Sequence, residues 1–412
     1  MSVEEDDARR LDQADPGHRE LFHVPPAEGG RYAEVAYLAG NSLGLQPKAT
    51  RAELLEDLDA WAALGVEAHL DAKRPWLPYH EPLTGPASRL IGALPGETVI
   101  MNSLTVNLHL LMVSFYRPAG ARTRVVIEDN AFPSDSYAVR SHVRFRGLDP
   151  DFDVVRVPAA EIPEFLSHSG GSVALVLLGG VNYLTGELLD IPGITALGQS
   201  RGAIVGWDLA HAAGNVPLRM HDWSADFAAW CSYKYLNAGP GALAGAFIHE
   251  RHLDAPSIQR FEGWWSTDPE TRFEMAPISR PLPKAETWAI SNPPIFSMGP
   301  VRTSLDIFDQ VGIDNLRMRS LRLTGYLESL LDGFDTFDIV TPRDPERRGC
   351  QLSLRVPGGA GALSRRLRFE HGVIADSREP DILRVAPVPL YNTFHDCWRV
   401  ADALRQVPWD LP

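Results

Sequence analysis

The sequence is poor in cysteine, in long hydrophobic runs and in positive charge. Its 412 residues include three cysteines, Cys231, Cys350 and Cys397, which lie far apart and form no CxxC pair. This pattern argues against a disulfide framework and a thiolate metal site, and we predict that the protein binds no metal. The longest apolar stretches, such as residues 173–178, have the length of a strand and are too short for a membrane span.

Negative charge dominates instead. The chain has 53 Asp and Glu residues against 39 Lys and Arg residues, a net charge of −14, so neither nucleic acid nor an anionic membrane is expected as a partner. The first 20 residues are acidic and polar, unlike a signal peptide, and together with the scarce cysteine they predict a cytoplasmic protein. A chain of this length is too long to fold around a single hydrophobic core, which predicts two domains.

Short β-branched runs alternate with helical segments in the middle of the chain. Strands buried on both faces that alternate with helices indicate an α/β fold in which helices cover a mainly parallel sheet. An amphipathic helix is expected from Arg51 to Leu64, and another from Thr105. The strands are predicted at 123–128, 174–181, 203–208, 227–232 and 242–248.

Three regions are expected along the chain. Residues 1–50 form an N-terminal arm that packs with the small domain, and residues 51–300 form the large domain. Residues 301–412 form a smaller α+β domain, because long helical patterns there are followed by the strand CQLSLRV, another helix and a strand near ILRVAP.

Lys234 and Asp208 are the first candidates for chemistry. Lys234 lies in SYKYLNAGPG, after a buried strand and before a glycine-rich turn that can place its amine in a cavity, although a lone lysine is usually solvated. Asp208 ends the strand AIVGWD at the edge where α/β sheets bind ligands. It either caps the next helix or keeps a pyridinium nitrogen protonated. His211 either lies over the same ring or is a hydrogen-bonded core residue.

Two further segments suit a phosphorylated planar cofactor. Leu104 and Thr105 begin an apolar-periodic helix, whose N-terminus either binds a phosphate or has an ordinary Ser/Thr cap. Phe132 precedes Pro133 in a stiff turn, where its ring either stacks on a cofactor or packs in the core. Asp135 is placed to hydrogen-bond the periphery of such a ring.

These segments belong to a larger set that resembles kynureninases, which are pyridoxal 5'-phosphate (PLP) enzymes of fold type I in the aminotransferase superfamily. The match runs in chain order from about residue 37 to 396. DLAHA with SYKYLN is shared by the wider superfamily, whereas GNSLGLQPK, FPSD and RVAPVPLYN are specific. The matching segments are YLAGNSLGLQPK, KRPW, NSLTVNLHLLM, AFPSDSYA, VGWDLAHAAGNV, DFAAWCSYKYLNAGPGALAGAFIHE, EGWW, TRFEM, ISNPPI, RGCQLSL and LRVAPVPLYNTFHD.

The resemblance implies a role for each matching residue. Lys234 is the lysine that carries PLP and moves the substrate proton, Asp208 pairs with the pyridine nitrogen, and Tyr233 relays a proton near the γ-carbonyl. The implied cofactor contacts are Leu104, Thr105, Phe132, Pro133, Ser134, Asp135, Gly179, Asp208, His211, Tyr233, Lys234, Trp264 and Asn292.

The resemblance also implies how substrate binds. Arg384 matches the arginine that binds the α-carboxylate, a suitable use of a bidentate guanidinium. His69, Ser291 and Asn292 match positions around the aromatic ring of the substrate. Trp264 and Asn292 match residues that reach the site from the neighbouring subunit, which implies a homodimer with shared sites.

The implied reaction is hydrolysis of the Cβ–Cγ bond of kynurenine or 3-hydroxykynurenine, a step of tryptophan catabolism. The chain reads Ser266-Thr267 where the family has Gly-His, so a ring-substituted kynurenine of secondary metabolism stays open as substrate. Another PLP reaction is a rival, but a cysteine desulfurase-type lyase needs a mobile thiolate, and an aminotransferase leaves the specific motifs unexplained. A non-catalytic PLP-fold binding protein would not need Lys234 and Asp208.

Overall fold

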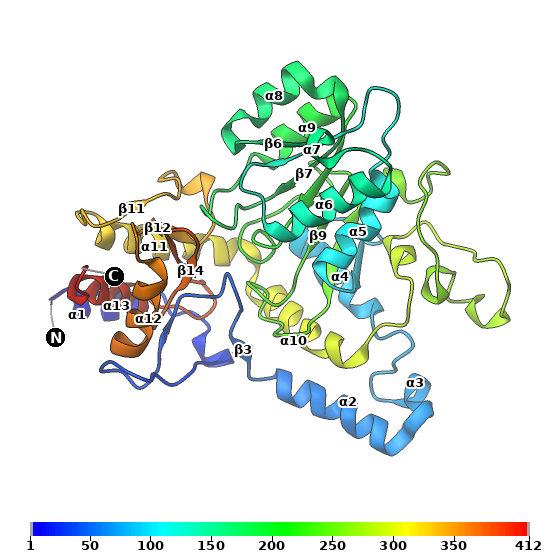
Figure 1. Cartoon of the computed structure of the whole chain (residues 1–412). Coiled ribbons are helices and arrows are strands. Elements are labelled where there is room, and N and C mark those ends of the chain that lie inside the picture. The colour runs from blue at the N-terminus through cyan, green and yellow to red at the C-terminus, as the bar shows by residue number, and fades with distance from the viewer. Residues whose placement is uncertain (1–2, 410–412) are drawn as a thin grey trace.

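A seven-stranded, mainly parallel sheet forms the centre of the large domain in the computed structural model, which describes residues 3–409 (Figure 1). The strands lie in the order β4-β10-β9-β8-β7-β5-β6. β10 is antiparallel to β4 and β9, whereas β9, β8, β7, β5 and β6 pair in parallel. The strands are β4 (Thr98–Met101), β5 (Arg124–Glu128), β6 (Val154–Val157), β7 (Val173–Gly179), β8 (Ile204–Asp208), β9 (Phe227–Trp230) and β10 (Ala244–Ile248).

Helices cover both faces of this sheet, as predicted. One face packs against α5 and α6, and the other against α4, α8, α9 and α10. Side chains alternate along the strands, so that Trp207 of β8 and Phe227 of β9 enter opposite cores. The helices are α4 (Glu81–Ile91), α5 (Leu104–Phe115), α6 (Pro133–Phe145), α7 (Pro150–Asp153), α8 (Ile162–Ser169), α9 (Ile191–Ser200) and α10 (Ile295–Val311).

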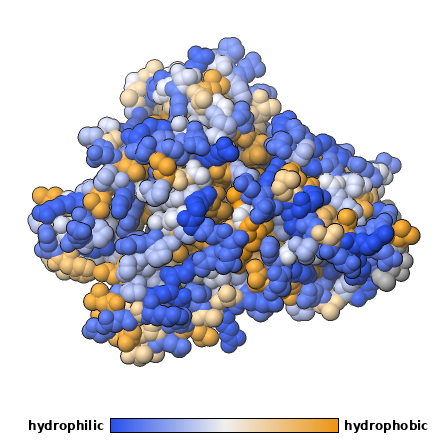
Figure 2. Space-filling view, turned by 180° about the vertical axis from the view of Figure 1, so that it is seen from behind, coloured by the Kyte–Doolittle hydropathy of each residue, from blue (hydrophilic) through white to orange (hydrophobic). Residues whose placement is uncertain are grey.

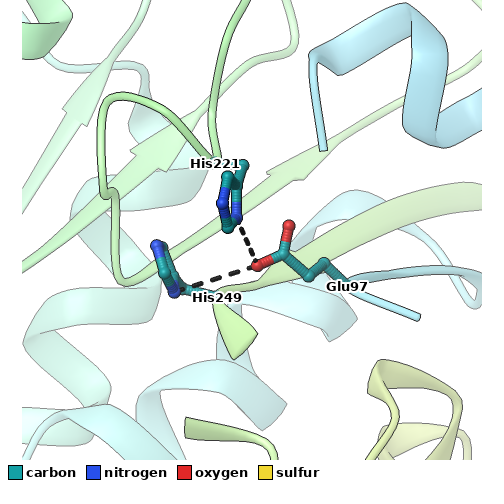
Figure 3. Close-up of side chains that lie close together, drawn as sticks. All are labelled: Glu97, His221 and His249. Carbon is teal, nitrogen blue, oxygen red and sulfur yellow. Dashed lines mark hydrogen bonds and ion pairs between the residues drawn. The ribbon is translucent and has the colours of Figure 1, made fainter. Parts of the chain in front are cut away.

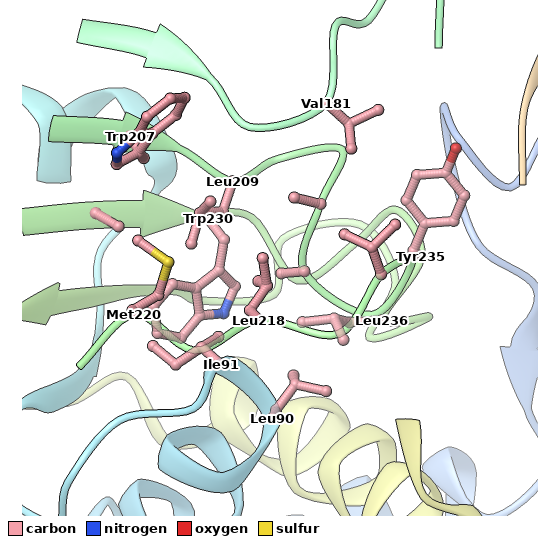
Figure 4. Close-up of a cluster of buried hydrophobic side chains, with 14 of the residues drawn as sticks. Leu90, Ile91, Val181, Trp207, Leu209, Leu218, Met220, Trp230, Tyr235 and Leu236 are labelled. Carbon is pink, nitrogen blue, oxygen red and sulfur yellow. The ribbon is translucent and has the colours of Figure 1, made fainter. Parts of the chain in front are cut away.

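Two tryptophans fill the core beneath the site. Trp207 and Trp230 are fully buried on adjacent strands, and the Trp230 ring lies next to Met220 and to Ile91 of α4 (Figure 4). The indole Nε1 of Trp207 donates a hydrogen bond to Thr195 Oγ1 at 3.0 Å. The large Trp207 side chain is therefore accommodated in the core with its polar atom paired.

The small domain is built on a four-stranded antiparallel sheet in the order β11-β12-β15-β14. The arm packs on it: α1 lies against α13, and β2 pairs in parallel with β13. These elements give the predicted α+β domain. The elements are α1 (Val3–Ala14), β2 (Ala36–Tyr37), α11 (Ile313–Leu331), β11 (Asp338–Ile339), β12 (Leu352–Arg355), α12 (Ala360–His371), β13 (Val373–Ile374), β14 (Asp376–Arg378), β15 (Ile382–Val385) and α13 (Phe394–Gln406).

The division predicted after residue 300 falls inside α10. Met298, Val301 and Leu305 of this helix belong to the large-domain core, and Gly312 separates α10 from α11. We therefore propose Gly312 as the boundary. The strands β4 and β6 were not predicted, because each has only four residues and lacks a long apolar run.

A helical lobe extends from the large domain at the bottom of Figure 1. It consists of α2 (Thr50–Leu64) and α3 (Ala68–Asp71), and α2 packs against α10. The remaining strands, β1 (Phe22–His23) and β3 (Gln46–Pro47), pair in the arm. Within residues 3–409, no helix combines the length and the apolar character that a membrane span requires.

Candidate active site

The candidate residues gather at one edge of the large sheet. Glu128, Gly179 and Asp208 are the last residues of the neighbouring parallel strands β5, β7 and β8, and Lys234 follows β9. This is the edge at which ligands bind in α/β sheets. The pocket there is lined by Ser103, Leu104, Thr105, Glu128, Phe132, Ser134, Asp135, Gly179, Val181, Asn182, Tyr183, Asp208, Ala210, His211, Tyr233 and Lys234.

The amine of Lys234 lies inside this pocket. Its Nζ is 2.9 Å from Nε2 of His211, and it lies 5.8 Å from the centre of the Phe132 ring. His211 is buried, and burial together with the Lys234 charge holds its pKa well below the ordinary value. A neutral imidazole at this point accepts a hydrogen bond from the ammonium of Lys234.

Two buried carboxyl groups, those of Asp208 and Asp135, line the pocket together with the amine. Asp208 Oδ1 accepts the Ala210 N–H at 2.7 Å, so the capping role considered from the sequence is present. Burial raises the pKa of Asp208, and burial next to Asp208 raises that of Asp135 well above its usual range. Asp135 Oδ1 has no hydrogen-bond partner although it is buried. The group that satisfies it must enter the pocket, because such an orphaned acceptor is costly.

Hydroxyl and amide donors lie at the opposite wall of the pocket. Thr105 Oγ1 is 2.6 Å from Ser134 Oγ, which joins the first turns of α5 and α6. The side chain of Ser103, at the N-cap of α5, makes no capping hydrogen bond. The first backbone N–H groups of α5 therefore remain available to an anion.

Glu128, Asn182 and Tyr183 line the pocket but were missed in the sequence. Glu128 accepts the Gly179 N–H at 2.9 Å and Asn182 Nδ2–H at 2.7 Å, and burial raises its pKa. The Tyr183 ring lies edge-on to Phe132 at 5.1 Å. Glu128 carried the signal that identified Asp208, an acid at the end of a buried strand, and the same reasoning could have found it.

The N-terminal arm closes over the Lys234 turn. The N–H of Gly44 donates to the Tyr233 carbonyl at 2.9 Å. A Cβ at Gly44 would lie 2.3 Å from the carbonyl oxygen of Lys234, closer than any side chain can approach. Gly44, the second glycine of GNSLG, is therefore required because its backbone lies in close contact with the turn that holds the lysine.

Six of the predicted residues are absent from the pocket lining: Pro133, although its neighbours Phe132 and Ser134 belong to it, Arg384, and four residues on other segments. His69 on α3 is exposed and packs edge-on against Trp76 at 5.5 Å. Ser291 and Asn292 are exposed in the loop before α10, and Trp264 is 39% exposed. One chain therefore brings together the cofactor residues around Lys234 without these four.

Arg384 is buried beside the pocket rather than in its lining. Its guanidinium donates to the Tyr183 carbonyl at 2.9 Å and forms an ion pair with Asp376, while its Nε has no partner. Arg378 pairs with the same carboxylate. The Arg384 guanidinium thus lies next to Tyr183 at the side of the pocket, and its Nε–H makes no hydrogen bond.

Comparison with known proteins decides the family. The family described as "Kynureninase C-terminal domain" matches residues 316–404. A protein named "Kynureninase" from Salinispora tropica is 68% identical over 97% of this chain and 96% of its own. The chain belongs to the kynureninase family. A second relative of that name, from Koribacter versatilis, is 52% identical over 95% of both chains.

The chain also shares its fold with more distant PLP enzymes. A solved structure of C-DES, with glycine linked covalently to its PLP cofactor, aligns with a TM-score of 0.78 at 16% identity, over 91% of this chain and 97% of that one. The predicted fold is confirmed, and so are the predictions of an enzyme, a hydrolase acting on a small amino acid, and PLP as its cofactor.

The pocket fits PLP by the chemistry of its donors. It offers an amine for the aldehyde, the buried Asp208 carboxyl for the ring nitrogen with the unpaired Asp135 Oδ1 beside it, an aromatic face, and a helix N-terminus with two hydroxyl groups for the phosphate. The thiolate of the rival desulfurase chemistry does not fit, because Cys231 and Cys350 are buried and burial raises the pKa of both thiols.

Proposed function

We propose that this pocket hydrolyses the Cβ–Cγ bond of L-kynurenine or 3-hydroxy-L-kynurenine, using one water to yield anthranilate or 3-hydroxyanthranilate and L-alanine. The observation that carries the proposal is the Lys234 amine held against His211, beside Asp208, in a chain of this family. The test is a comparison of kcat/KM for kynurenine, 3-hydroxykynurenine and ring-methylated analogues, with anthranilate release as the readout.

Bound PLP supplies an electron sink that stabilises negative charge on the substrate carbons. Lys234 would hold the cofactor through its amine, and the same amine is the base for the substrate Cα proton. Asp208, with Asp135 beside it, would keep the pyridine nitrogen protonated. Phe132 would face the ring, and Thr105 with Ser134 would bind the phosphate. Support comes from the position of these side chains around one pocket.

Tyr233 is proposed to deliver a proton near the γ-carbonyl. Burial raises the pKa of its phenol, so the hydroxyl stays protonated at neutral pH and serves as a donor. The 6.0 Å distance between its ring and Lys234 Nζ supports a role for both groups in proton transfer. Arg384 is proposed to bind the substrate α-carboxylate through its unused Nε–H.

We further propose a homodimer with shared sites. On α2 a polar residue is buried and apolar residues are exposed, the opposite of the usual pattern. Asp57 is buried and accepts a hydrogen bond from the Tyr79 hydroxyl at 2.5 Å. Leu58 and Trp61 are 43% and 57% exposed. In Figure 2, seen from behind, hydrophobic side chains are visible on the lobe formed by α2 and α3. An exposed apolar face of this kind marks an interaction surface.

The dimer accounts for the residues outside the pocket. His69 lies on this lobe, Trp264 begins a short 3-10 helix with its side chain 39% exposed, and Ser291 and Asn292 lie on an exposed loop. We propose that they complete the pocket of the partner subunit, where His69 and Asn292 address the ring hydroxyl of 3-hydroxykynurenine. Unpaired polar groups cost ~1–3 kcal/mol, so kynurenine should be poorer by roughly one to two orders of magnitude.

The departure at Ser266-Thr267 bears on the substrate ring. Ser266 is buried and donates to the Ala289 carbonyl at 3.0 Å, and Thr267 Oγ1 accepts the Arg280 N–H at 2.9 Å. Both side chains therefore bind their own loop. A ring-substituted kynurenine remains the second candidate substrate, since threonine is smaller than the family histidine. The cytosol remains our proposed compartment, because all three cysteines are free.

A further inference from the structure

A cluster of two histidines and one glutamate lies at the sheet edge opposite the PLP pocket (Figure 3). Glu97 immediately precedes β4, His249 immediately follows β10, and His221 lies in the connection from β8 to β9. Because β10 runs antiparallel to β4 and β9, its end meets the beginnings of those strands. Three segments that are distant in the sequence therefore converge at one point.

The ligand atoms of the cluster are close enough to share one ion. Nδ1 of His221 is 3.0 Å from Glu97 Oε1, and Nδ1 of His249 is 3.8 Å from the same oxygen. The two imidazole rings stack with their centres 5.0 Å apart, and all three ligand atoms lie within 4.8 Å of one another. Donors about 2 Å from a common metal ion must have this spacing.

The carboxylate is held in place by the backbone. Glu97 is 1% exposed, its Oε1 accepts the Glu250 N–H at 2.7 Å, and its Oε2 accepts the Leu94 N–H at 2.8 Å. Such outer contacts orient a metal ligand before the ion arrives. The Arg251 N–H, 3.3 Å from His249 Nδ1, makes a long contact that a bound ion would replace.

The surroundings favour a cation. Glu250 and Asp222 add negative charge beside His221, while the nearby positive charge of Arg251 is paired with Asp226 at 2.6 Å. The His221 side chain is 25% exposed, which gives an ion access from solvent. Two imidazoles and a carboxylate suit zinc, nickel or cobalt better than calcium or magnesium, which prefer oxygen ligands.

We propose that Glu97, His221 and His249 form a binding site for a divalent transition metal ion, which joins three segments at the back of the large sheet. The site lies away from the chemistry, so its effect is on stability rather than on turnover. Cysteine spacing in the sequence could not reveal this site, because the site contains no cysteine. Its ligands are far apart in the sequence and become neighbours only through the antiparallel strand β10.

The test uses the PLP-loaded enzyme after EDTA treatment and dialysis, titrated with zinc chloride in a calorimeter. We expect the wild-type protein and the control His168→Ala, at an exposed position of α8, to bind zinc at this site with the same stoichiometry per chain and the same affinity. His221→Ala should bind zinc at this site at least ~10-fold more weakly, the scale of defects in metal sites. Zinc should also raise the Tm of the wild type and of His168→Ala, but not that of His221→Ala.

Unchanged kynurenine turnover by His221→Ala would show that this variant is folded. If it does not fold, cobalt added to the wild-type enzyme tests the site directly, because imidazole–carboxylate coordination gives visible absorption bands that zinc abolishes. Any zinc that PLP chelates contributes equally to His221→Ala and to the control His168→Ala, so it does not affect the comparison between them. Equal zinc affinity in His221→Ala and wild type, or wild-type protein without zinc-sensitive cobalt bands, would overturn the proposal.

Discussion

The PLP pocket and the α2–α3 lobe show opposite patterns of burial. In the pocket, Asp208, Asp135 and His211 are buried within one chain. On the lobe, the apolar Leu58 and Trp61 are exposed while Asp57 is buried. Folding of one chain is enough to bury the polar side chains of the pocket, which then lacks only its ligand. The second region has an apolar face that only another surface can cover.

This difference bears on how the proposed active site would be divided between two chains. The residues proposed to handle protons and the cofactor come from one chain, whereas those proposed to recognise the substrate ring lie on the lobe or on exposed loops. Chemistry and ring selectivity should therefore be separable by mutation. Substitutions around Lys234 should affect turnover of every substrate, and those around His69 and Thr267 should discriminate between substrates.

The largest effect is expected from Lys234→Ala in the pocket. Turnover should be abolished and PLP should bind only non-covalently, because no other amine lines the pocket within the described residues. Borohydride treatment followed by mass spectrometry measures the covalent link. Lys284→Ala, at an exposed position, is the control and should retain both properties. A reducible link that persists in Lys234→Ala would disprove the assignment.

Asp208→Asn is expected to lose at least ~10²-fold in kcat, the scale of general acid–base effects. Asparagine keeps an oxygen for the Ala210 N–H but cannot hold the pyridine nitrogen protonated. This substitution thus separates the cap from the electrostatic role, and Asp208→Ala removes both. Near-native kcat in Asp208→Asn with PLP bound would mean that Asp208 is only a cap.

The double substitution of Leu58→Glu and Trp61→Glu is expected to dissociate the dimer and remove most of the activity. Burying two carboxylates in an apolar interface is unfavourable, whereas on a free surface they are harmless. Sedimentation velocity measures the assembly state. Phe145→Glu, also at an exposed aromatic position, is the control. A wild-type sedimentation coefficient in the double variant would place the interface elsewhere.

Shared sites predict complementation between inactive subunits. Exchange of Lys234→Ala with Trp264→Ala chains should restore about a quarter of wild-type activity, because half of the dimers are mixed and each has one intact site. Lys234→Ala with Asp208→Ala is the matched control, and it should stay inactive because both residues belong to the same pocket. Equal recovery in the two mixtures would contradict a site built from two chains.

The sequence predicted the site best where a strand ends in a polar residue. Asp208 and Lys234 were found in this way, and the predicted strands correspond to β5, β7, β8, β9 and β10. Glu128 was missed although it ends β5 in the same manner. β4 and β6 were missed because neither has more than three consecutive apolar residues, whereas the apolar run of the equally short β9 continues into Cys231.

The exposed side of α2 is harder to predict than the helix itself. The apolar pattern from Arg51 to Leu64 predicted a helix, and α2 is one. The same pattern ordinarily indicates a face towards the core of its own chain, but here that face is exposed. Only the structure shows this, because the core-facing contact of α2 is made by the buried Asp57 with Tyr79.

The smallest effect is expected from Thr267→His in the loop that follows Trp264. Restoring the family histidine should lower kcat/KM for ring-methylated kynurenines by up to roughly tenfold, because a bulkier side chain opposes the added methyl group. The value for 3-hydroxykynurenine should be nearly unchanged, since His69 and Asn292 are proposed to recognise the hydroxyl.

Thr267→Ser controls for the loop itself, because serine retains a hydroxyl to accept the Arg280 N–H. Its kinetics should follow the wild type with all substrates. If Thr267→His reduces kcat/KM equally for all rings, the substitution acts on the loop and not on ring selectivity. Equal wild-type kcat/KM for kynurenine and 3-hydroxykynurenine would also remove hydroxyl recognition, and the α2–α3 lobe would then complete the dimer without selecting the substrate.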